Sequence, residues 1–505
     1  MKRLMSLYRF FEIIPGALTW TTLAVVVILS ATAPVFMAIF IILFDVYWLL
    51  KIIYFSFHLR ATFKRMREYM KTDWLGEIKK LEEAAHVPKM EDIYHLVILP
   101  MYKEPYEVVK ESFESLRKAD YPKDKFIVVL ATEERGGEEG REVAEKVTKE
   151  FGNSFFKFLV TTHPGGIPGE LAGKGSNETW SGREVKRLII DPLKIPYKNI
   201  LVSVFDVDTQ IFPGYFGRLT YAFLKEPKRQ RASFQPIPLF TNNIYEAPSL
   251  ARVIAFSSTF WHMMNQSRPE RITTFSSHSM PFEALVEIDF WDVSHVSEDS
   301  MIFWQCYLHY NSDWKVVPLF YPVSMDANVA PKFWQTLINL YKQQRRWAWG
   351  SENIPYMLYG FVKNKAIPKS KKFYWSFHII ESFHSWGTNA LLIFALGWLP
   401  LFVGGEEFNL TTLSFNLPQV TRTLMTLATL GIASSAILSI ILLPPKPEWF
   451  KTRHYILYFI QWLLMPATLI IFGALPAIEA QTRLMLGGKL RLGFWVTPKI
   501  RTKSA

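Results

Sequence analysis

The chain has 505 residues, 50% of them hydrophobic and 15% aromatic, and a net charge of +12. This composition is too apolar for an ordinary soluble enzyme, while a charged fraction of 20% excludes a protein that lies wholly inside a membrane. The single cysteine, Cys306, excludes an internal disulfide and thiolate-rich metal sites, and basic residues beside apolar segments predict orientation at a bilayer and no nucleic-acid partner.

The first predicted element is a hairpin of two membrane-spanning helices, at about 16–33 and 34–56. Its length is about twice the ~20 residues that cross a bilayer, and Ala33-Pro34 supplies the turn. Both ends of the hairpin are basic, which places them in the cytoplasm. Asp45 is costly in lipid and is expected to face other helices, either as a plain polar contact or as a functional group.

Strands that alternate with helices follow the hairpin and its charged linker. This order predicts a mainly parallel sheet that binds ligands at the carboxyl ends of its strands. The strands are expected at 95–100, 126–131, 158–161 and 200–205, with helices at 107–118 and 141–151.

Polar residues follow several of these strands. The first strand runs into Pro100-Met-Tyr102-Lys-Glu104, which presents backbone groups and an aromatic ring to a flat base, or forms a plain strand-to-helix turn. Glu133 follows the second strand. A glycine-rich loop then carries Lys174, which offers charge and exposed N–H groups to phosphate oxygens, although the spacing is not that of a P-loop.

The run from Ile200 to Phe205 ends in Asp206-Val-Asp208. In an extended chain these two carboxylates point the same way, and a pair of aligned carboxylates can hold a hard divalent cation. The alternative is a buried strand that ends in an ordinary polar turn. Two further motifs support the metal site: Ser297-Glu298-Asp299, followed by a predicted helix at 300–310, and Gln343-x-x-Arg346-Trp347.

In this order the three motifs resemble those of the membrane-embedded family 2 glycosyltransferases, which include cellulose, chitin and hyaluronan synthases. The resemblance covers roughly 94–350 and the apolar segments on both sides. It implies a GT-A fold, that is, an α/β catalytic domain with a Rossmann-like, mainly parallel sheet, inserted between α-helical transmembrane segments.

The resemblance also implies a role for each motif residue. Asp299 is the base that deprotonates the acceptor, with Glu298 as the alternative, and His278 either contacts a sugar hydroxyl or is structural. Many members have an aspartate pair that binds uracil at the end of the second strand, and this chain departs from them with Glu133. The resemblance makes a UDP-sugar the expected donor, and the departure leaves GDP as the alternative. The residues expected to bind the nucleotide-sugar donor or the acceptor are Pro100, Tyr102, Glu104, Glu133, Lys174, Asp206, Gln343, Arg346 and Trp347, with Mg²⁺ or Mn²⁺ on Asp206 and Asp208.

The C-terminal part is apolar again. Spans are expected from about 385 to 403 and over 421–443, whereas 454–478 is interrupted by Pro466 and Pro476. If this last stretch crosses once, the basic tail lies outside, against the positive-inside tendency. If it re-enters or crosses twice, the tail stays in the cytoplasm, which we favour. The span count is therefore four plus a broken one, five, or six.

Three functions fit the sequence. The first is an inverting membrane transferase that adds sugars to a growing polysaccharide, with export of the product as a further hypothesis. The second transfers one sugar to a polyprenyl phosphate or another lipid acceptor, and the third is a non-catalytic membrane scaffold.

We expect a multi-pass protein of the plasma or inner membrane with a cytosolic catalytic domain, and a homo-oligomer is compatible with the sequence. The predicted parts are a hairpin (1–57), a linker (58–93), the GT-A domain (94–330), interfacial helices (331–384), transmembrane segments (385–481) and a basic cytosolic tail (482–505).

Overall fold

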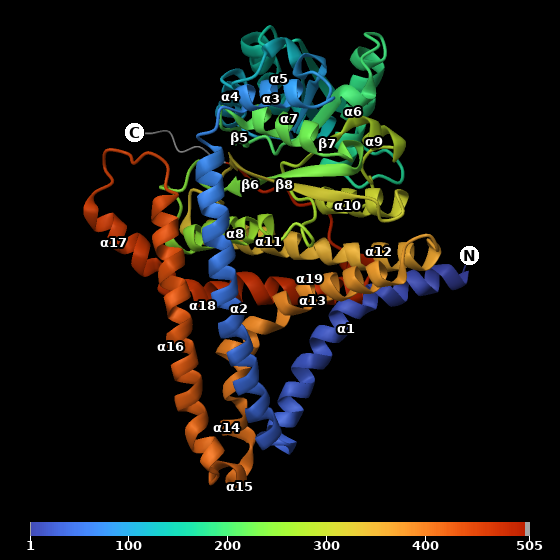
Figure 1. Cartoon of the computed structure of the whole chain (residues 1–505). Coiled ribbons are helices and arrows are strands. Elements are labelled where there is room, and N and C mark those ends of the chain that lie inside the picture. The colour runs from blue at the N-terminus through green and yellow to red at the C-terminus, as the bar shows by residue number, and fades with distance from the viewer. Residues whose placement is uncertain (1, 500–505) are drawn as a thin grey trace.

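The computed structural model describes residues 2–499 and shows an α/β domain mounted on a bundle of long helices (Figure 1). The helices of the bundle converge at the end distant from the α/β domain. The two parts are joined by α2, which starts in the bundle and runs without a break up to the α/β domain.

The α/β domain is built on one eight-stranded sheet with the order β3-β2-β1-β4-β7-β6-β8-β5. Neighbours β3, β2, β1 and β4 are parallel, as are β6 and β8, whereas β7 and β5 pair antiparallel with their neighbours. The predicted mainly parallel, Rossmann-like sheet is therefore confirmed. The strands are β1 (Tyr94–Pro100), β2 (Phe126–Glu133), β3 (Lys157–His163), β4 (Ile200–Val204), β5 (Gln210–Ile211), β6 (Ala232–Leu239), β7 (Ser279–Pro281) and β8 (Lys315–Ser324).

Helices cover both faces of the sheet, so the strands are apolar throughout. Alternate residues of each strand reach opposite cores: Val97 and Leu99 enter one, and Leu96 and Ile98 enter the other. The first core contains α3 (Trp74–Ala84), α4 (Tyr106–Arg117), α5 (Gly137–Phe151) and α7 (Tyr215–Lys225). The second contains α6 (Lys174–Val185), α9 (Phe282–Glu287), α10 (Glu298–His309) and α12 (Asn353–Lys363).

Within residues 2–499, four helical segments are long and apolar enough to cross a membrane, and a fifth qualifies if a helix pair bent by 49° counts as one span. The first two form the predicted hairpin, and the turn lies at Ala33 because Pro34 starts a new helix. The bundle consists of α1 (Lys2–Thr32), α2 (Pro34–Tyr69), the bent pair α13 (Lys369–Phe394) and α14 (Leu399–Val403), α15 (Gly405–Asn409) and α16 (Thr412–Ile441).

The last apolar segment differs from the others in direction. It is divided into α17 (Thr452–Ile460), α18 (Met465–Leu469) and α19 (Leu475–Leu486), with Pro466 and Pro476 at the starts of the second and third pieces. In Figure 1, α18 and α19 run across the base of the α/β domain, transverse to α2 and α16. The chain after α19 therefore starts on the side of the α/β domain and returns to it. Two more helices line this base, α8 (Ser249–Gln266) and α11 (Phe333–Ala348).

Candidate active site

The candidate site lies where the parallel strands end. Register places Pro100 of β1 beside Ala131 of β2, and Ile98 beside Val204 of β4, so their carboxyl ends open at one edge. The first of the three motifs, Asp206-Val-Asp208, follows β4. Asp206 accepts a hydrogen bond from the backbone N–H of Thr209 through its backbone oxygen, so the motif is a turn. The extended geometry predicted for Asp206 and Asp208 is therefore wrong, and the turn aims their carboxylates at different partners.

Lys174 joins the motifs that the sequence keeps apart. Its Nζ lies 2.9 Å from Asp206 Oδ1, 3.4 Å from Glu298 Oε1 and 3.4 Å from Glu178 Oε1. Lys174 begins α6, and Gly175 next to it lets α10 approach: a Cβ at that position would lie 3.0 Å from Glu298 Cβ. One buried cation thus contacts a carboxylate from the turn after β4 and another from the start of α10.

Asp208 is fully buried and has its own set of partners. Its Oδ2 accepts hydrogen bonds from the backbone N–H of Asp326 (2.9 Å) and from Lys499 Nζ (2.6 Å). Its Oδ1 is buried without a hydrogen-bond partner among residues 2–499. The C-terminal tail therefore places an ammonium group against the carboxylate for which the sequence predicts a metal ion.

Buried acids outnumber cations at this site. Burial raises the pKa of Asp208, of Asp299 and of Glu178, and raises that of Glu298 to about 7. Only Asp206 has a lowered pKa, because Lys174 and Lys499 outweigh its burial. Burial opposes the charge of Lys174, yet the surrounding carboxylates raise its pKa well above the ordinary value. Burial thus favours the protonated form of these acids, and a further cation beside them would favour the ionised form.

Glu298 and Asp299 form the first turn of α10, where the helix dipole favours negative charge. The turn is held from outside by Glu352, which the sequence analysis did not identify. Its Oε1 accepts from the N–H groups of Val296 and Ser297 (both 2.9 Å) and from Ser297 Oγ (2.7 Å). Its Oε2 accepts from Trp349 Nε1 at 2.8 Å. Glu352 is a positioning residue for the two carboxylates.

We expect Glu352→Gln to lower transfer about tenfold with little change in donor KM, because the amide cannot accept on both sides and misplaces the start of α10. Losing hydrogen bonds to a charged acceptor should also cost ~1.5–3 kcal/mol of unfolding free energy. Glu184→Gln is the matched control, since among residues 2–499 Glu184 pairs only with Arg187, at 2.7 Å and three residues along the chain. Equal kinetics for the two variants would remove the positioning role.

Helix α11 brings the third motif to the same place. Gln343 is buried and its Oε1 accepts from Asn328 Nδ2 at 3.4 Å. Arg346 acts electrostatically on both Glu298 and Asp299, and its Nε is buried without a partner within the described chain. Trp347 packs 6.0 Å from the Phe240 ring. Arg346 therefore faces the carboxylates of α10, while Trp347 forms part of an apolar wall.

The strand-end residues predicted to bind the nucleotide divide into two groups. Glu104 is half-buried near Asp208 and Lys499, and its carboxylate accepts from the N–H of Tyr102 at 2.7 Å; desolvation raises its pKa. Pro100 ends β1 just before them. Glu133 instead turns away and pairs with Arg135, whose guanidinium lies 5.2 Å from the Tyr102 ring centre.

His278 is buried with Nδ1 3.0 Å from the backbone oxygen of Phe275. Burial and the charge of Lys174 lower its pKa to about 4, so the ring is neutral at physiological pH and Nδ1 donates to that carbonyl. Its Nε2 is buried without a partner in the described chain. This unpartnered acceptor suits a hydroxyl donor from a bound sugar.

The position of Lys499 leads us to expect that this lysine and a divalent cation compete for Asp208. Even a divalent cation on the unpartnered Oδ1 would be repelled by the Lys499 ammonium, which lies 2.6 Å from Oδ2 of the same carboxylate, so the two cations compete for Asp208. We expect Lys499→Ala to bind Mn²⁺ about tenfold more tightly without donor, because Asp208 is left as an uncompensated buried charge. Calorimetry measures the affinity, with exposed Lys489→Ala as control. Unchanged or weaker Mn²⁺ binding would contradict the competition.

The carboxylates fit a metal that a diphosphate also ligates. Among residues 2–499 no group of three or more His, Cys, Asp or Glu side chains surrounds a common metal position. Asp208 nevertheless has a buried oxygen without a partner, and a lysine already supplies positive charge beside it. These hard oxygen donors suit Mg²⁺ or Mn²⁺ with the remaining ligands from substrate and water.

Comparisons with known proteins give only distant likenesses. No protein-family model and no curated protein matches the chain. Among solved structures, the mannosyltransferase PcManGT from Pyrobaculum calidifontis in complex with GDP-Man and Mn²⁺ is 13% identical, with a TM-score of 0.40, over 77% of this chain and 99% of that one. S. aureus TarS 1–349 in complex with UDP-GlcNAc is 13% identical, with a TM-score of 0.37, over 68% and 90%. At such TM-scores the likenesses carry no argument, and the activity has to be inferred from the site itself.

Proposed function

We propose that the protein is an inverting membrane glycosyltransferase of the GT-A type that transfers a sugar from a nucleoside-diphosphate sugar to a growing polysaccharide. The observation that carries this proposal is the contact of one buried lysine, Lys174, with Asp206 on one side and Glu298 on the other. Lys174 thereby brings the Asp206-Val-Asp208 motif, proposed to hold the diphosphate, next to the Glu298-Asp299 pair, proposed to supply the base. Transfer by a single displacement requires both groups close to the same sugar carbon.

The donor half of the site consists of strand ends and cations. Tyr102 and Glu104 lie at the end of β1, where a nucleotide would rest, with Lys174 and Arg346 for the diphosphate. Asp206 and Asp208 would hold Mg²⁺ or Mn²⁺, which supplies charge neutralisation to the leaving diphosphate when it is bound. Fixed positive groups at developing negative charge are a large catalytic contribution, worth ~3–4 kcal/mol for a single donor.

The acceptor half supplies the proton acceptor. Asp299 takes the proton of the acceptor hydroxyl. The hydroxyl oxygen attacks the anomeric carbon of the donor sugar while the bond between that carbon and the diphosphate breaks, which inverts the configuration at the carbon. Arg346 lies near Asp299 and helps to keep it ionised despite burial. Glu298 is already engaged by Lys174 at 3.4 Å, so it is the weaker candidate for the base.

The helical bundle places this chemistry at a bilayer. We propose four spans, formed by α1, α2, the α13–α14 pair and α16, with the α/β domain and the tail in the cytosol. The transverse course of α18 and α19 supports this, because it brings the tail back to Asp208 without a further crossing (Figure 1). Helices α11 and α19 are in contact, and Arg345 Nη1 lies 2.6 Å from Glu479 Oε1. The helix that carries the third motif is therefore tied directly to the transverse helix under the α/β domain.

Incubation of the full-length protein in vesicles with labelled UDP- and GDP-sugars tests the proposal. We expect long polymer, formed only with a divalent cation and lost in Asp299→Asn. A product that extracts as a lipid carrying one sugar would replace the polysaccharide with a lipid acceptor. No incorporation from any donor would remove the transferase assignment.

A further inference from the structure

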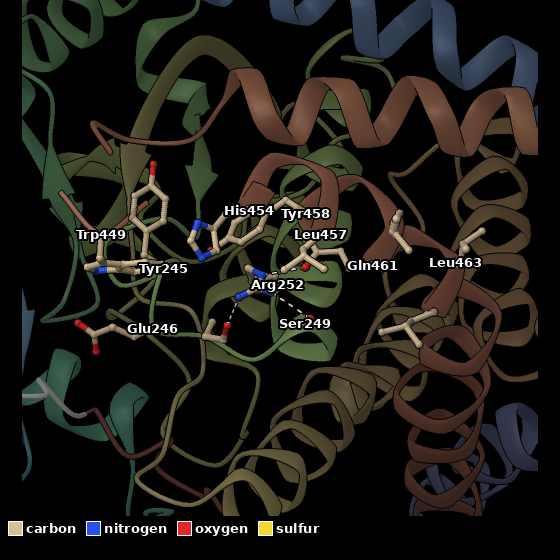
Figure 2. A pocket seen from close by; sticks show the side chains of 13 residues that line it. Tyr245, Glu246, Ser249, Arg252, Trp449, His454, Leu457, Tyr458, Gln461 and Leu463 are labelled. Carbon is tan, nitrogen blue, oxygen red and sulfur yellow. Dashed lines mark hydrogen bonds between the residues drawn. The ribbon is translucent and has the colours of Figure 1, made fainter. Parts of the chain in front are cut away.

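A second cavity lies away from the candidate active site, at the base of the α/β domain (Figure 2). Its volume is about 690 Å³, and its walls come from the start of α8, the connection between α16 and α17, and α17 with the turn after it. Cavities of ~300–1,000 Å³ are typical of sites for small ligands. Among the described residues that line it, none belongs to the candidate active site, so its ligand would be separate from the donor and the acceptor.

Arg252 places a positive charge in the wall of this cavity. Its guanidinium donates only to neutral groups: the backbone oxygen of Ala247, Ser249 Oγ at 3.0 Å and Gln461 Oε1 at 2.8 Å (Figure 2). It stacks 4.0 Å from the Tyr458 ring centre, and among residues 2–499 it forms no ion pair with a carboxylate. Arg252 also lies in the first turn of α8, where the helix dipole disfavours a cation and favours an anion. An anion in the cavity would supply the missing countercharge.

Gln461 gives a second, independent sign of a missing ligand. Its side chain is 4% exposed and lines the cavity, and its Oε1 accepts from Arg252. Its Nε2 is buried without a hydrogen-bond partner in the described chain. Because buried donors are almost always paired in native proteins, this one requires an acceptor from the cavity. Arg252 and Gln461 together offer a cation and a neutral N–H donor, which is a combination that phosphate oxygens accept.

The charges around the cavity also favour an anion. The only carboxylate among its described lining residues is that of Glu246, which is exposed and engaged in an interaction of its own, and which does not contribute to the electrostatic environment of Arg252. The exposed charged residues of the connection between α16 and α17 and of the first turn of α17 are Lys446, Lys451 and Arg453 against Glu448. This excess of cations attracts a ligand with a net negative charge.

The remaining lining is largely apolar and uncovered. Leu463 is 76% exposed, Leu457 57% and Ile460 49%, and all three belong to the apolar segment Thr452–Leu486. Trp449, on the connection after the proposed span α16, is 52% exposed. Tryptophan side chains are enriched at the level of lipid headgroups, with apolar residues on the hydrocarbon side. A ligand with an anionic head and apolar chains would therefore match both parts of the cavity.

We propose that this cavity binds the headgroup of an anionic phospholipid, with its phosphate oxygens on Arg252 and Gln461 and its acyl chains along the exposed face of α17 and the following turn. The position suits a lipid, since α16, a proposed span, ends at Ile441, just before the connection that carries Trp449. The proposal rests on the placement of the bundle in a bilayer but not on the sugar-transfer activity, and its test measures lipid binding alone.

Native mass spectrometry of the full-length protein in detergent tests the site, with phosphatidylglycerol, phosphatidylcholine and glycerol 3-phosphate as probes. The two lipids share a phosphodiester and acyl chains but differ in net charge, and glycerol 3-phosphate has a phosphate without chains. We expect one saturable phosphatidylglycerol, at least tenfold weaker phosphatidylcholine, and no retention of glycerol 3-phosphate. Equal binding of the two lipids would overturn the anionic assignment. Retention of glycerol 3-phosphate as strong as that of phosphatidylglycerol would overturn the lipid assignment.

Gln461→Glu is the variant that tests the phosphate contact while sparing the fold. The new carboxylate still accepts from Arg252, but the buried N–H donor is replaced by a negative charge that repels a phosphate. We expect phosphatidylglycerol binding to fall at least tenfold. Gln419→Glu is the matched control, because it makes the same change at an exposed position near the opposite end of α16, and it should bind phosphatidylglycerol as the wild type does.

Leu463→Ser tests the acyl contact without touching Arg252 or Gln461, and we expect a three- to tenfold loss of phosphatidylglycerol binding. Wild-type binding in Gln461→Glu would refute the phosphate site, and wild-type binding in Leu463→Ser would refute the course of the acyl chains. A loss in Gln419→Glu as large as that in Gln461→Glu would also refute the site, because added negative charge would then act wherever it is placed.

Discussion

Asp299→Asn is expected to reduce sugar transfer by ~10²–10⁴-fold, the usual contribution of a general base, while donor affinity changes little. The asparagine keeps the shape of the side chain at the start of α10 but cannot accept the acceptor proton. Initial rates with a labelled donor measure the first effect and calorimetry the second. Glu298→Gln is the matched comparison, and a larger loss in that variant would move the base to Glu298.

The pH profile gives a further test of the same residue. Burial raises the pKa of Asp299 above its ordinary value of 3.8. A base acts only when deprotonated, so activity should fall as pH falls through this raised pKa, at a higher pH than a free aspartate would give. The acid limb of kcat/KM for the wild type should therefore lie at a higher pH than the ordinary aspartate pKa of 3.8. An acid limb at or below that value would contradict a base whose pKa is raised by burial.

Asp208→Asn is expected to abolish turnover because it weakens metal-dependent binding of the donor. Asp208 is fully buried, and its carboxylate is the group that a divalent cation would neutralise. Replacing it should remove the metal dependence of donor binding and weaken that binding at least tenfold, because one amide cannot supply the charge that a hard cation requires. Calorimetric titration with donor, with and without Mn²⁺, measures both changes.

Asp289→Asn is the control for this variant, because Asp289 is exposed and, within the described part of the chain, pairs only with Arg183 at 3.0 Å. The two aspartate variants also test the division of labour between the motifs. Equal donor affinity in Asp208→Asn and Asp299→Asn would contradict separate roles for the metal site and the base.

Local patterns predicted the fold well. Pro34 marks the turn of the first hairpin because proline is favoured in the first turn of a helix and disfavoured in its interior, and β2 is recognisable since Phe126 to Ala131 is an unbroken apolar run between polar turns. The two cores, one on each side of the sheet, follow from these unbroken apolar runs, because alternate residues of a strand point to opposite faces. The sequence was less informative about helix length, because the charged end of α2 up to Tyr69 reads as a separate linker although it continues the helix.

The candidate site was predictable only where a motif is contiguous. Glu352 and Lys499 lie far along the chain from the groups they contact, and neither stands in a pattern that points to Ser297 or Asp208. The turn after β4 was also missed, because strand alternation was extended past Val204 to Asp206. Such contacts arise from tertiary packing, which periodicity and spacing do not encode.

The segment from Thr241 to Ala247 connects the turn after β4 to the start of α8. Asn242 Nδ2 donates to the backbone oxygen of Asp208 at 2.9 Å and to Asp326 Oδ1 at 3.0 Å, and the backbone oxygen of Ala247, five residues on, accepts from the Arg252 guanidinium. A displacement of α8 would therefore be transmitted along this short segment to the turn that presents Asp208, so the helices at the base of the α/β domain and the strand-end carboxylates are mechanically coupled.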